Sequence, residues 1–330
     1  MSLKKLGEGL PLSLEESYRL ALSMLRGELG EVEIAAALTA MRVRGEVPEE
    51  VAGFVKAARE TCVKVEVDVP AIDTAGTGGD GQKTINLSTA AALVASAVGA
   101  YVLKHGNRSV TSPTGSADFL EAIGYNINLK PEEAVAAIKR SRFAFLFAPA
   151  YHPTFARVAP VRKRLPFRTI FNVVGPLANP GGVKRQVMGV AERRLMSVVA
   201  NAASILGLEH VLVVHGEPGV DEASIEGPTI VMEVRNGRVD EYVVEPEDFG
   251  ATRGKIPRAE TREESVAKTL NGLRGIDKEA ERAIAVNAAL ALYVAGVTKD
   301  LRDGYELAVK AIESGEVARH IDLVVKASRP

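Results

Sequence analysis

The stretch that decides the fold opens with I-D-T-A-G-T-G-G-D-G at residues 72–81 and reaches Y-V-L-K-H-G-N-R-S at residues 101–109. The apolar run at 69–72 predicts a strand that enters a glycine-rich turn, and the Ala-rich segment 88–99 predicts a helix. A second predicted strand, Tyr101–Leu103, leads into a basic loop. This order indicates a βαβ unit, whose loops follow the carboxyl ends of parallel strands, where open α/β sheets bind their ligands.

The glycine loop has the character of an anion site. Gly76, Gly78, Gly79 and Gly81 let backbone N–H groups approach an anion closely. The helix that begins near Ser88 adds free N–H groups and the positive end of its dipole. The unit is therefore predicted to hold phosphate.

The composition restricts the class of protein. A chain of 330 residues suggests two domains, and 46% hydrophobic with 25% charged residues is typical of a soluble globular protein. The net charge of -1 argues against a general role on nucleic acid or a membrane surface. The single cysteine, Cys62, excludes an intrachain disulfide and fits a reducing cytosol. Because no apolar run reaches about 18 residues and no signal-peptide pattern is present, we expect a cytoplasmic protein that binds neither nucleic acid nor membrane.

The first 67 residues are predicted to be entirely helical. S-L-E-E at 13–16 is a capping box ahead of one helix, residues 31–44 form a second, and Pro48 opens a third. Three helices before any strand indicate a small separate helical domain, residues 1–67. This layer is either an oligomerisation surface or simply packs on the main sheet.

The remainder, residues 68–330, is predicted to be an α/β domain. Strand and helix patterns alternate over most of it, which indicates a central, mostly parallel sheet flanked by helices. A Pro- and Arg-rich stretch at about 152–182 interrupts the alternation, and we interpret it as an excursion back to the helical layer. Asn236-Gly237 between two alternating runs predicts a type I′ hairpin.

Residues 76–81 match G-x-G-x-x-G, but their context argues against a dinucleotide site. Such a site requires an acidic residue at the end of the second strand, where this chain has Lys104 and His105. Asp80 would also repel a bare pyrophosphate, so the loop is better suited to pyrophosphate and sugar held together with a metal ion. No Walker A pattern occurs, which argues against phosphoryl transfer of the P-loop kind.

Two pairs of polar residues are candidate metal or phosphate ligands. Ser88 and Thr89 stand where the first helix begins, either as helix caps or as hydroxyl ligands of phosphate or magnesium. Asp221 and Glu222 are adjacent carboxylates after a strand, which form either a solvated turn or a magnesium site. Magnesium takes one or two carboxylates and leaves its other positions to water and substrate phosphates. The five histidines show no metal-ligand spacing.

Arg162, Lys163 and Arg164 form a short basic run. It is either a solvated helix face or the binding site of an acidic second substrate, because an arginine can grip a carboxylate bidentately. The spacing leaves open which of the three would do so. His105 and His152 have no partnered nucleophile that the sequence reveals, and no G-x-S-x-G elbow occurs.

Taken together, these motifs resemble those of the anthranilate phosphoribosyltransferase family, in its order and spacing over about residues 70–225. The matching motifs are G-T-G-G-D (76–80), N-L-S-T (86–89), K-H-G-N-R-S (104–109), G-S-A-D (115–118), Y-H-P (151–153), V-R-K (161–163), R-T-I-F-N (168–172), G-P-L (175–177) and G-V-D-E (219–222). The sequence departs from the family at Pro113-Thr114, where Lys-Ser is common. That loop covers the ligand in the family, so the departure affects loop mobility and affinity.

The resemblance implies a site for each of two substrates. 5-Phosphoribosyl 1-pyrophosphate (PRPP) would be held by Gly76, Gly79, Asp80, Thr84, Asn86, Leu87, Ser88, Thr89, Lys104, His105, Gly106, Asn107, Arg108, Ser109, Val110, Thr111, Ser112 and Ser116. Anthranilate would be bound by Gly76, Asn107, His152, Arg162 and Pro176, and magnesium by Ser88, Asp221 and Glu222. His105 and His152 would position substrates, and no residue is assigned as an essential acid or base.

The resemblance also implies an architecture and a reaction. The expected fold is a small helical domain beside a larger α/β domain, similar to nucleoside phosphorylases and phosphoribosyltransferases. A homodimer would form through the helical domain, with Leu38 and Met41 as candidate contact residues. The amine of anthranilate would displace pyrophosphate from the ribose C1, a glycosyltransferase step of tryptophan biosynthesis. Two alternatives remain: a pyrimidine nucleoside phosphorylase, which needs no Asp-Glu metal pair, and a related binding protein without catalysis.

Overall fold

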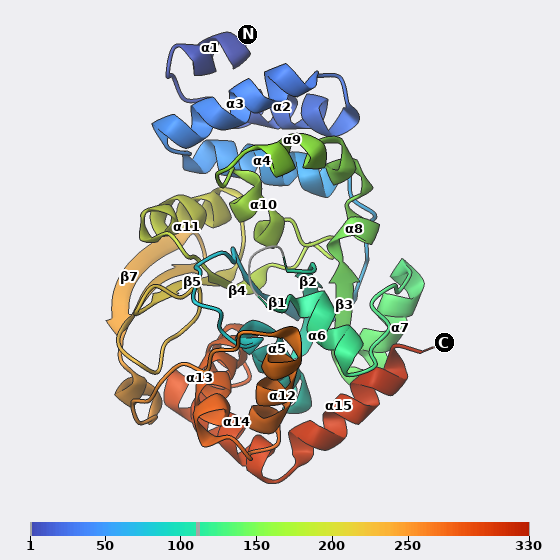
Figure 1. Cartoon of the computed structure of the whole chain (residues 1–330), viewed down its shortest axis with the longest axis vertical. Coiled ribbons are helices and arrows are strands. Elements are labelled where there is room, and N and C mark those ends of the chain that lie inside the picture. Colours follow the sequence, from blue (N-terminus) through green and yellow to red (C-terminus); the bar gives the residue numbers. More distant parts are fainter. Residues whose placement is uncertain (1, 110–112, 330) are drawn as a thin grey trace.

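A computed structural model describes residues 2–109 and 113–329 and contains a seven-stranded sheet in the order β3-β2-β1-β4-β5-β6-β7. Strands β3, β2, β1, β4 and β5 are parallel, and the hairpin of β6 and β7 adds two antiparallel strands at one edge. Figure 1 shows a layer of helices from the N-terminal segment on one side of this sheet and the C-terminal helices on the other. The predicted fold class, a small helical domain with a larger, mostly parallel α/β domain, is confirmed.

The elements have the following bounds. The strands are β1 (Ala71–Gly76), β2 (Tyr101–Gly106), β3 (Phe143–Phe147), β4 (Arg185–Gly189), β5 (His210–Gly216), β6 (Thr229–Arg235) and β7 (Arg238–Val244). The α-helices are α1 (Ser2–Gly7), α2 (Leu14–Arg26), α3 (Glu31–Arg44), α4 (Pro48–Glu60), α5 (Leu87–Ala97), α6 (Ser116–Ala122), α7 (Pro131–Ser141), α8 (Ala148–Tyr151), α9 (Ala159–Arg164), α10 (Phe171–Leu177), α11 (Met196–Ile205), α12 (Arg262–Leu273), α13 (Lys278–Ala295), α14 (Leu301–Glu313) and α15 (Glu316–Ala327). The described residues also form the short 3-10 helices η1 (Pro153–Arg157), η2 (Arg193–Leu195) and η3 (Pro246–Phe249).

The sheet separates two hydrophobic cores. Successive strand residues face opposite sides, so on β5 the side chains of Leu212 and Val214 enter one core while Val211 and Val213 enter the other. The first core also contains the buried faces of α5 and α13, and the second contains those of α4 and α11. A strand that is apolar on both faces is typical of a parallel sheet covered on both sides.

The segment around residues 153–177 lies against the N-terminal helices. Thr154 shares a hydrogen bond of 3.1 Å with Thr61, and Arg164 forms a 3.0 Å ion pair with Glu31 on α3. Phe171 packs edge-on against Phe54 of α4, with ring centroids 5.5 Å apart. Figure 1 shows α9 and α10 next to the N-terminal helices although they follow β3 in the chain, and α9 contacts α3 while α10 contacts α4.

Local sequence signals produce most of the predicted turns and helix ends. Ser13 and Glu16 form the reciprocal capping box at the start of α2. Asn236 and Gly237 both have positive φ, as a type I′ turn between β6 and β7 requires. Strand β1 begins at Ala71, two residues after the start of the predicted run, and both β1 and β2 extend beyond their predicted ends, because their parallel pairing continues to Gly76 and Gly106.

The candidate dimer residues require a correction. The side chains of Leu38 and Met41 are fully buried inside the helical layer, so neither can meet a second copy. The outward stripe of α3 instead carries Val32 and Val43, which are 80% and 81% exposed, together with exposed Ala36. The helix is apolar on more than one face, and apolar character alone does not indicate which face the fold buries.

Candidate active site

The glycine loop follows β1 at the carboxyl edge of the sheet. Gly78, Gly79 and Gly81 have positive φ, which favours glycine. The backbone N–H of Gly78 donates to Asp221 Oδ2 at 2.6 Å, and Arg168 donates to the Gly78 carbonyl. A Cβ at Gly76 would overlap the Asp221 carboxylate. The loop therefore closely contacts side chains that the chain delivers from two distant segments.

Three carboxylates gather beside this loop. Asp221 and Glu222 follow β5, and Asp80 comes from the loop itself. Burial raises the pKa of Asp221 to about 6, helped by the nearby charge of Asp80, and burial with repulsion from Asp221 raises the pKa of Glu222 well above its usual value. Glu222 Oε1 accepts a 3.3 Å hydrogen bond from the backbone N–H of Ser88, at the start of α5.

The carboxylate cluster fits a cation. Glu222 Oε2 and Asp80 Oδ2 are buried without a hydrogen-bond partner, which is costly for an acceptor in a site with several negative charges. Among residues 2–109 and 113–329, no group of three or more His, Cys, Asp or Glu side chains is placed to hold a metal ion, so the three carboxylates do not form a metal site by themselves. An incomplete oxygen set is what magnesium uses when substrate phosphates supply its remaining ligands. The donors present therefore fit the predicted magnesium ion.

Lys104 lies in β2, one position before His105, and both residues belong to the strand rather than to the predicted basic loop. Its ammonium group donates to the backbone and hydroxyl oxygens of Thr74, and only 1% of the residue is exposed. Burial lowers the pKa of Lys104 to about 8, opposed by the attraction of Asp73. A buried cation next to the glycine loop is suited to a strongly charged anion.

Asp73 was missed by the sequence reasoning. This buried strand residue accepts hydrogen bonds from the backbone of His105 at 3.2 Å and from the side chain of Asn179 at 2.8 Å. Burial raises the pKa of Asp73 to about 6, although the charge of Lys104 lowers it. A carboxylate in an otherwise apolar strand was the available signal, but its partner Asn179 is 106 residues away in the chain.

His105 and His152 form a buried imidazole pair with ring centroids 5.0 Å apart. Burial lowers the pKa of His105 to about 3 and that of His152 to about 4, so both are neutral near pH 7. His152 Nε2 donates to the Ala178 carbonyl at 3.0 Å, which leaves Nδ1 as an acceptor with no partner. His105 Nε2 is likewise buried and unpartnered.

Ring contacts connect this pair to Arg162. His152 stacks on Phe155 at 4.7 Å, and Phe155 packs edge-on against Phe171 at 5.6 Å. The Arg162 guanidinium lies 5.3 Å from the centre of the Phe171 ring. Burial lowers the pKa of Arg162, and in the described part of the chain no carboxylate pairs with it. Neither phenylalanine was predicted as a site residue.

Several of the other predicted site residues already form hydrogen bonds or ion pairs within the chain. Asn86 donates to the carbonyls of Thr114 and Gly115 at 3.2 Å each, and Ser116 donates to the Asn107 carbonyl at 3.2 Å. Arg108 is held by α6, with 3.0 Å to Asp118 and 2.7 Å to Glu121. The remaining positions are Thr84 in the loop, Leu87 and Thr89 in the first turn of α5, Gly106 at the end of β2, Ser109 after it, and Pro176 in α10. Val110, Thr111 and Ser112 lie outside the described residues.

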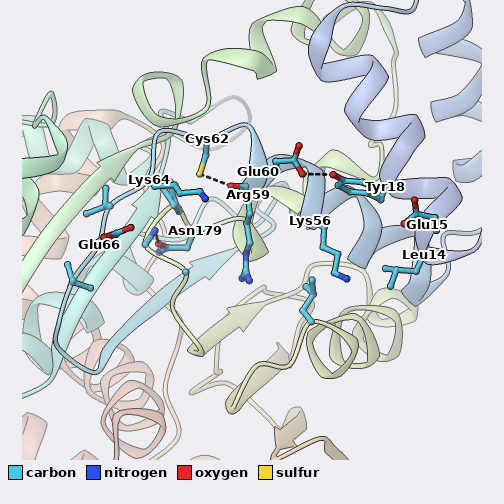
Figure 2. Close-up of a pocket in the computed structure, with 16 residues that line it drawn as sticks. Leu14, Glu15, Tyr18, Lys56, Arg59, Glu60, Cys62, Lys64, Glu66 and Asn179 are labelled. Atoms are coloured by element: carbon cyan, nitrogen blue, oxygen red, sulfur yellow. Dashed lines mark hydrogen bonds between the residues drawn. The ribbon is translucent and has the colours of Figure 1, made fainter.

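A separate groove of about 820 Å³ lies beside the linker between the helical layer and the sheet. Figure 2 shows Arg59, Cys62 and Asn179 among the residues that line it. None of the predicted substrate or metal residues lines this groove.

The part of the chain that the structure describes has no helix long and apolar enough to cross a membrane.

Comparisons with known proteins show what the chain is similar to. The model of the glycosyl transferase family a/b domain matches residues 68–318, and that of the family's helical bundle domain matches residues 2–62. An anthranilate phosphoribosyltransferase of Pyrobaculum calidifontis is 64% identical over 99% of this chain and 98% of its own length. The crystal structure of the Thermus thermophilus enzyme of that name has a TM-score of 0.94 and 40% identity, covering 100% of this chain and 99% of that one. The Saccharomyces cerevisiae enzyme in complex with PRPP and Mg has a TM-score of 0.85 and 27% identity, covering 96% and 92%.

Proposed function

The chain belongs to the anthranilate phosphoribosyltransferase family of glycosyl transferases, and on this premise we propose how its residues carry out the family's reaction. It is an enzyme of tryptophan biosynthesis that transfers the phosphoribosyl group of PRPP to the amine of anthranilate. The products are N-(5-phosphoribosyl)anthranilate and pyrophosphate.

The observation that carries the assignment is the meeting of two chemically different half-sites at one sheet edge. One half combines the glycine loop, buried Lys104 and the carboxylates Asp221 and Glu222. The other combines two neutral imidazoles with Arg162, whose half-buried guanidinium has no carboxylate partner among the described residues. The first suits a metal-bound pyrophosphate, and the second suits an aromatic acid.

PRPP is proposed to occupy the first half. Its pyrophosphate would lie on the glycine loop and the start of α5, near Lys104, and its ribose and 5-phosphate would reach the loop after β2. The proposed residues are Gly76, Gly79, Asp80, Thr84, Asn86, Leu87, Ser88, Thr89, Lys104, His105, Gly106, Asn107, Arg108, Ser109, Val110, Thr111, Ser112 and Ser116. Arg108 would first have to leave its two partners on α6.

Magnesium would be held by Ser88, Asp221 and Glu222. The Mg in the yeast relative and the orphaned Oε2 of Glu222 support that assignment. When bound, magnesium would neutralise charge on the pyrophosphate as it leaves.

Anthranilate is proposed to lie between the imidazole pair and Arg162, with Gly76, Asn107 and Pro176 lining its pocket. The guanidinium of Arg162 would grip the carboxylate bidentately. His152 Nδ1, an unpaired acceptor, would orient the amine through one of its N–H groups. This use of His152 is positioning, because the aromatic amine is already neutral at pH 7.

The reaction then requires orientation and charge stabilisation rather than a base. The C1–O bond of PRPP breaks, its electron pair passes to pyrophosphate, and the amine nitrogen forms the new C1–N bond before losing a proton to solvent. Lys104 and the loop N–H groups stabilise the leaving charge, which develops in a buried site. Positioning both substrates supplies the remainder of the rate enhancement.

Closure between two domains is proposed to keep water from the activated sugar. The domains would be residues 1–67, joined by the excursion at 152–182, and residues 68–330. Support comes from the contacts of Thr154 with Thr61 and of Arg164 with Glu31, which attach the excursion to the helical layer.

A homodimer through the helical domain is also proposed, with a second copy covering the exposed stripe of α3 formed by Val32, Ala36 and Val43. A twofold contact needs only one self-complementary patch. A cytoplasmic location is proposed as well. It is supported by the biosynthetic reaction and by the single, unpaired cysteine, which suits a reducing compartment.

One assay tests the function directly. Protein, magnesium, PRPP and anthranilate are mixed, and the loss of anthranilate fluorescence is followed together with the release of pyrophosphate. Equal rates of the two signals are expected. Replacing anthranilate and PRPP by a pyrimidine nucleoside and inorganic phosphate should give no turnover. Turnover with the nucleoside and phosphate alone would instead identify the protein as a nucleoside phosphorylase.

A further inference from the structure

Arg168 brings a positive charge from the excursion to the glycine loop. It lies between α9 and α10, in the segment that packs on the N-terminal helices. Its Nη2 donates to the carbonyl of Gly78, and the guanidinium is so close to Gly79 that any Cβ there would overlap it. The contact crosses from the helical layer to the loop proposed to hold pyrophosphate.

The charge of Arg168 is not neutralised within the described chain. Residues 2–109 and 113–329 provide no carboxylate that forms an ion pair with it, whereas Arg164 in the same segment pairs with Glu31 at 3.0 Å. The described contacts use one of the five N–H donors of the guanidinium, and that one donates to a neutral carbonyl. A half-buried guanidinium with free N–H donors beside a loop that is proposed to bind phosphate is suited to binding an anion.

We propose that Arg168 is a catalytic residue for the departure of pyrophosphate. With PRPP in the loop, its free donors bind the pyrophosphate and neutralise the charge that develops as the C1–O bond breaks and the electron pair passes to the leaving group. Because Arg168 belongs to the excursion, this contact also joins the helical layer to the loaded loop. The inference rests on the proposed function and adds a residue that the family resemblance did not assign to either substrate.

The test compares Arg168→Gln, Arg168→Lys and Arg168→Ala with the control Arg157→Gln, which changes an exposed arginine of η1 in the same segment. Glutamine keeps a polar side chain but carries no charge, whereas lysine keeps the charge, so the two variants separate stabilisation of the leaving group from the contact with the Gly78 carbonyl. We expect Arg168→Gln to lower kcat about 100-fold, the loss typical of one donor to a developing anion. The KM for anthranilate should stay within about twofold, and the inhibition constant of magnesium pyrophosphate should rise about 10-fold or more. Arg157→Gln should match the wild type.

Two further measurements make the outcome decisive. Arg168→Lys should retain part of kcat, and added guanidinium at millimolar concentration should partly restore Arg168→Ala without affecting wild type. Wild-type kcat and pyrophosphate inhibition in Arg168→Gln would overturn the inference and leave Arg168 as a support for the loop. If that variant fails to fold, absence of both the lysine activity and the guanidinium rescue would overturn it. A wild-type protein that does not turn over PRPP and anthranilate would instead refute the proposed function. In that case, the affinities of wild type and Arg168→Lys for magnesium pyrophosphate, measured by calorimetry, would still test whether Arg168 binds pyrophosphate.

Discussion

The carboxylate of Asp221 accepts a hydrogen bond from the backbone N–H of Gly78, with 2.6 Å between Oδ2 and the nitrogen. This bond joins the proposed metal half of the site to the loop proposed for pyrophosphate. Both groups need other partners when the substrate binds, because the N–H would face a phosphate oxygen and the carboxylate would face magnesium. The hydrogen-bonding capacity of one group of the site is therefore met by another group of the site.

The first prediction concerns the double variant Asp221→Asn, Glu222→Gln. Its turnover should fall at least about 100-fold, because removing groups that organise leaving-group charge typically costs this much. Chelation of the wild type with EDTA should abolish turnover, and magnesium should restore it. Full activity of a thoroughly chelated sample would contradict the metal assignment.

The same variant should be more stable to heat than the wild type. The folded pKa of Asp221, about 6, is above its usual 3.8, so the stability linked to this carboxyl is fully present below pH 3.8 and is lost as pH rises through 6. An amide removes that penalty at pH 7.5, and we expect a gain on the order of 1–3 kcal/mol in the free energy of unfolding. Thermal unfolding without metal measures it. A less stable variant would show that the carboxylates hold the fold rather than strain it.

The second prediction separates the substrates through Arg162. Arg162→Ala should raise the anthranilate KM about 10- to 150-fold, the range for losing a charged hydrogen bond of about 1.5–3 kcal/mol. The KM for PRPP should change little, and lysine should restore binding only in part because it lacks the bidentate fork. A fall in kcat at constant anthranilate KM would instead place Arg162 in the transition state. Unchanged constants would mean that this arginine does not contact the substrate.

How far the sequence could lead is shown by two residues of the site. Gly79 and its loop were predictable because local glycine content, a following helix start and strand alternation all indicate the same structure. Asp73 was not, because its function depends on Asn179, a residue 106 positions away that reaches it only in the folded chain. Strand ends were likewise extended by pairing between distant segments, such as Gly76 with Gly189. Val43 was overlooked because periodicity marks apolar stripes without indicating which one the fold covers.

The third prediction tests that stripe. Val43→Glu should convert the dimer to a monomer, because a charge buried at a twofold contact has no partner there. Ile276→Glu is the matched control, since Ile276 is also exposed, at 68%, but lies far along the chain near α12 and α13. Light scattering at micromolar concentration gives the masses. A monomeric wild type, or a dimeric Val43→Glu protein, would exclude this surface.

The last prediction uses the pKa of Lys104, which burial lowers to about 8. The free enzyme should lose this charge as pH rises through 8, so kcat/KM for PRPP should fall on the alkaline side with a midpoint near 8. The value of kcat should fall later or not at all, because bound pyrophosphate favours the charged ammonium and kcat reports the loaded enzyme. The free energy of unfolding should change in the opposite direction. In the unfolded chain Lys104 keeps its proton up to about pH 10.4. Between pH 8 and that value the unfolded state therefore binds more protons than the folded state, and the free energy of unfolding rises with pH.

Two variants test the assignment to Lys104. Lys104→Arg keeps a charge throughout and should lack the fall in kcat/KM near pH 8, while Lys104→Met should show weak PRPP binding at every pH. An unchanged alkaline limb in Lys104→Arg would assign that titration to another group and remove Lys104 from the recognition of pyrophosphate by charge.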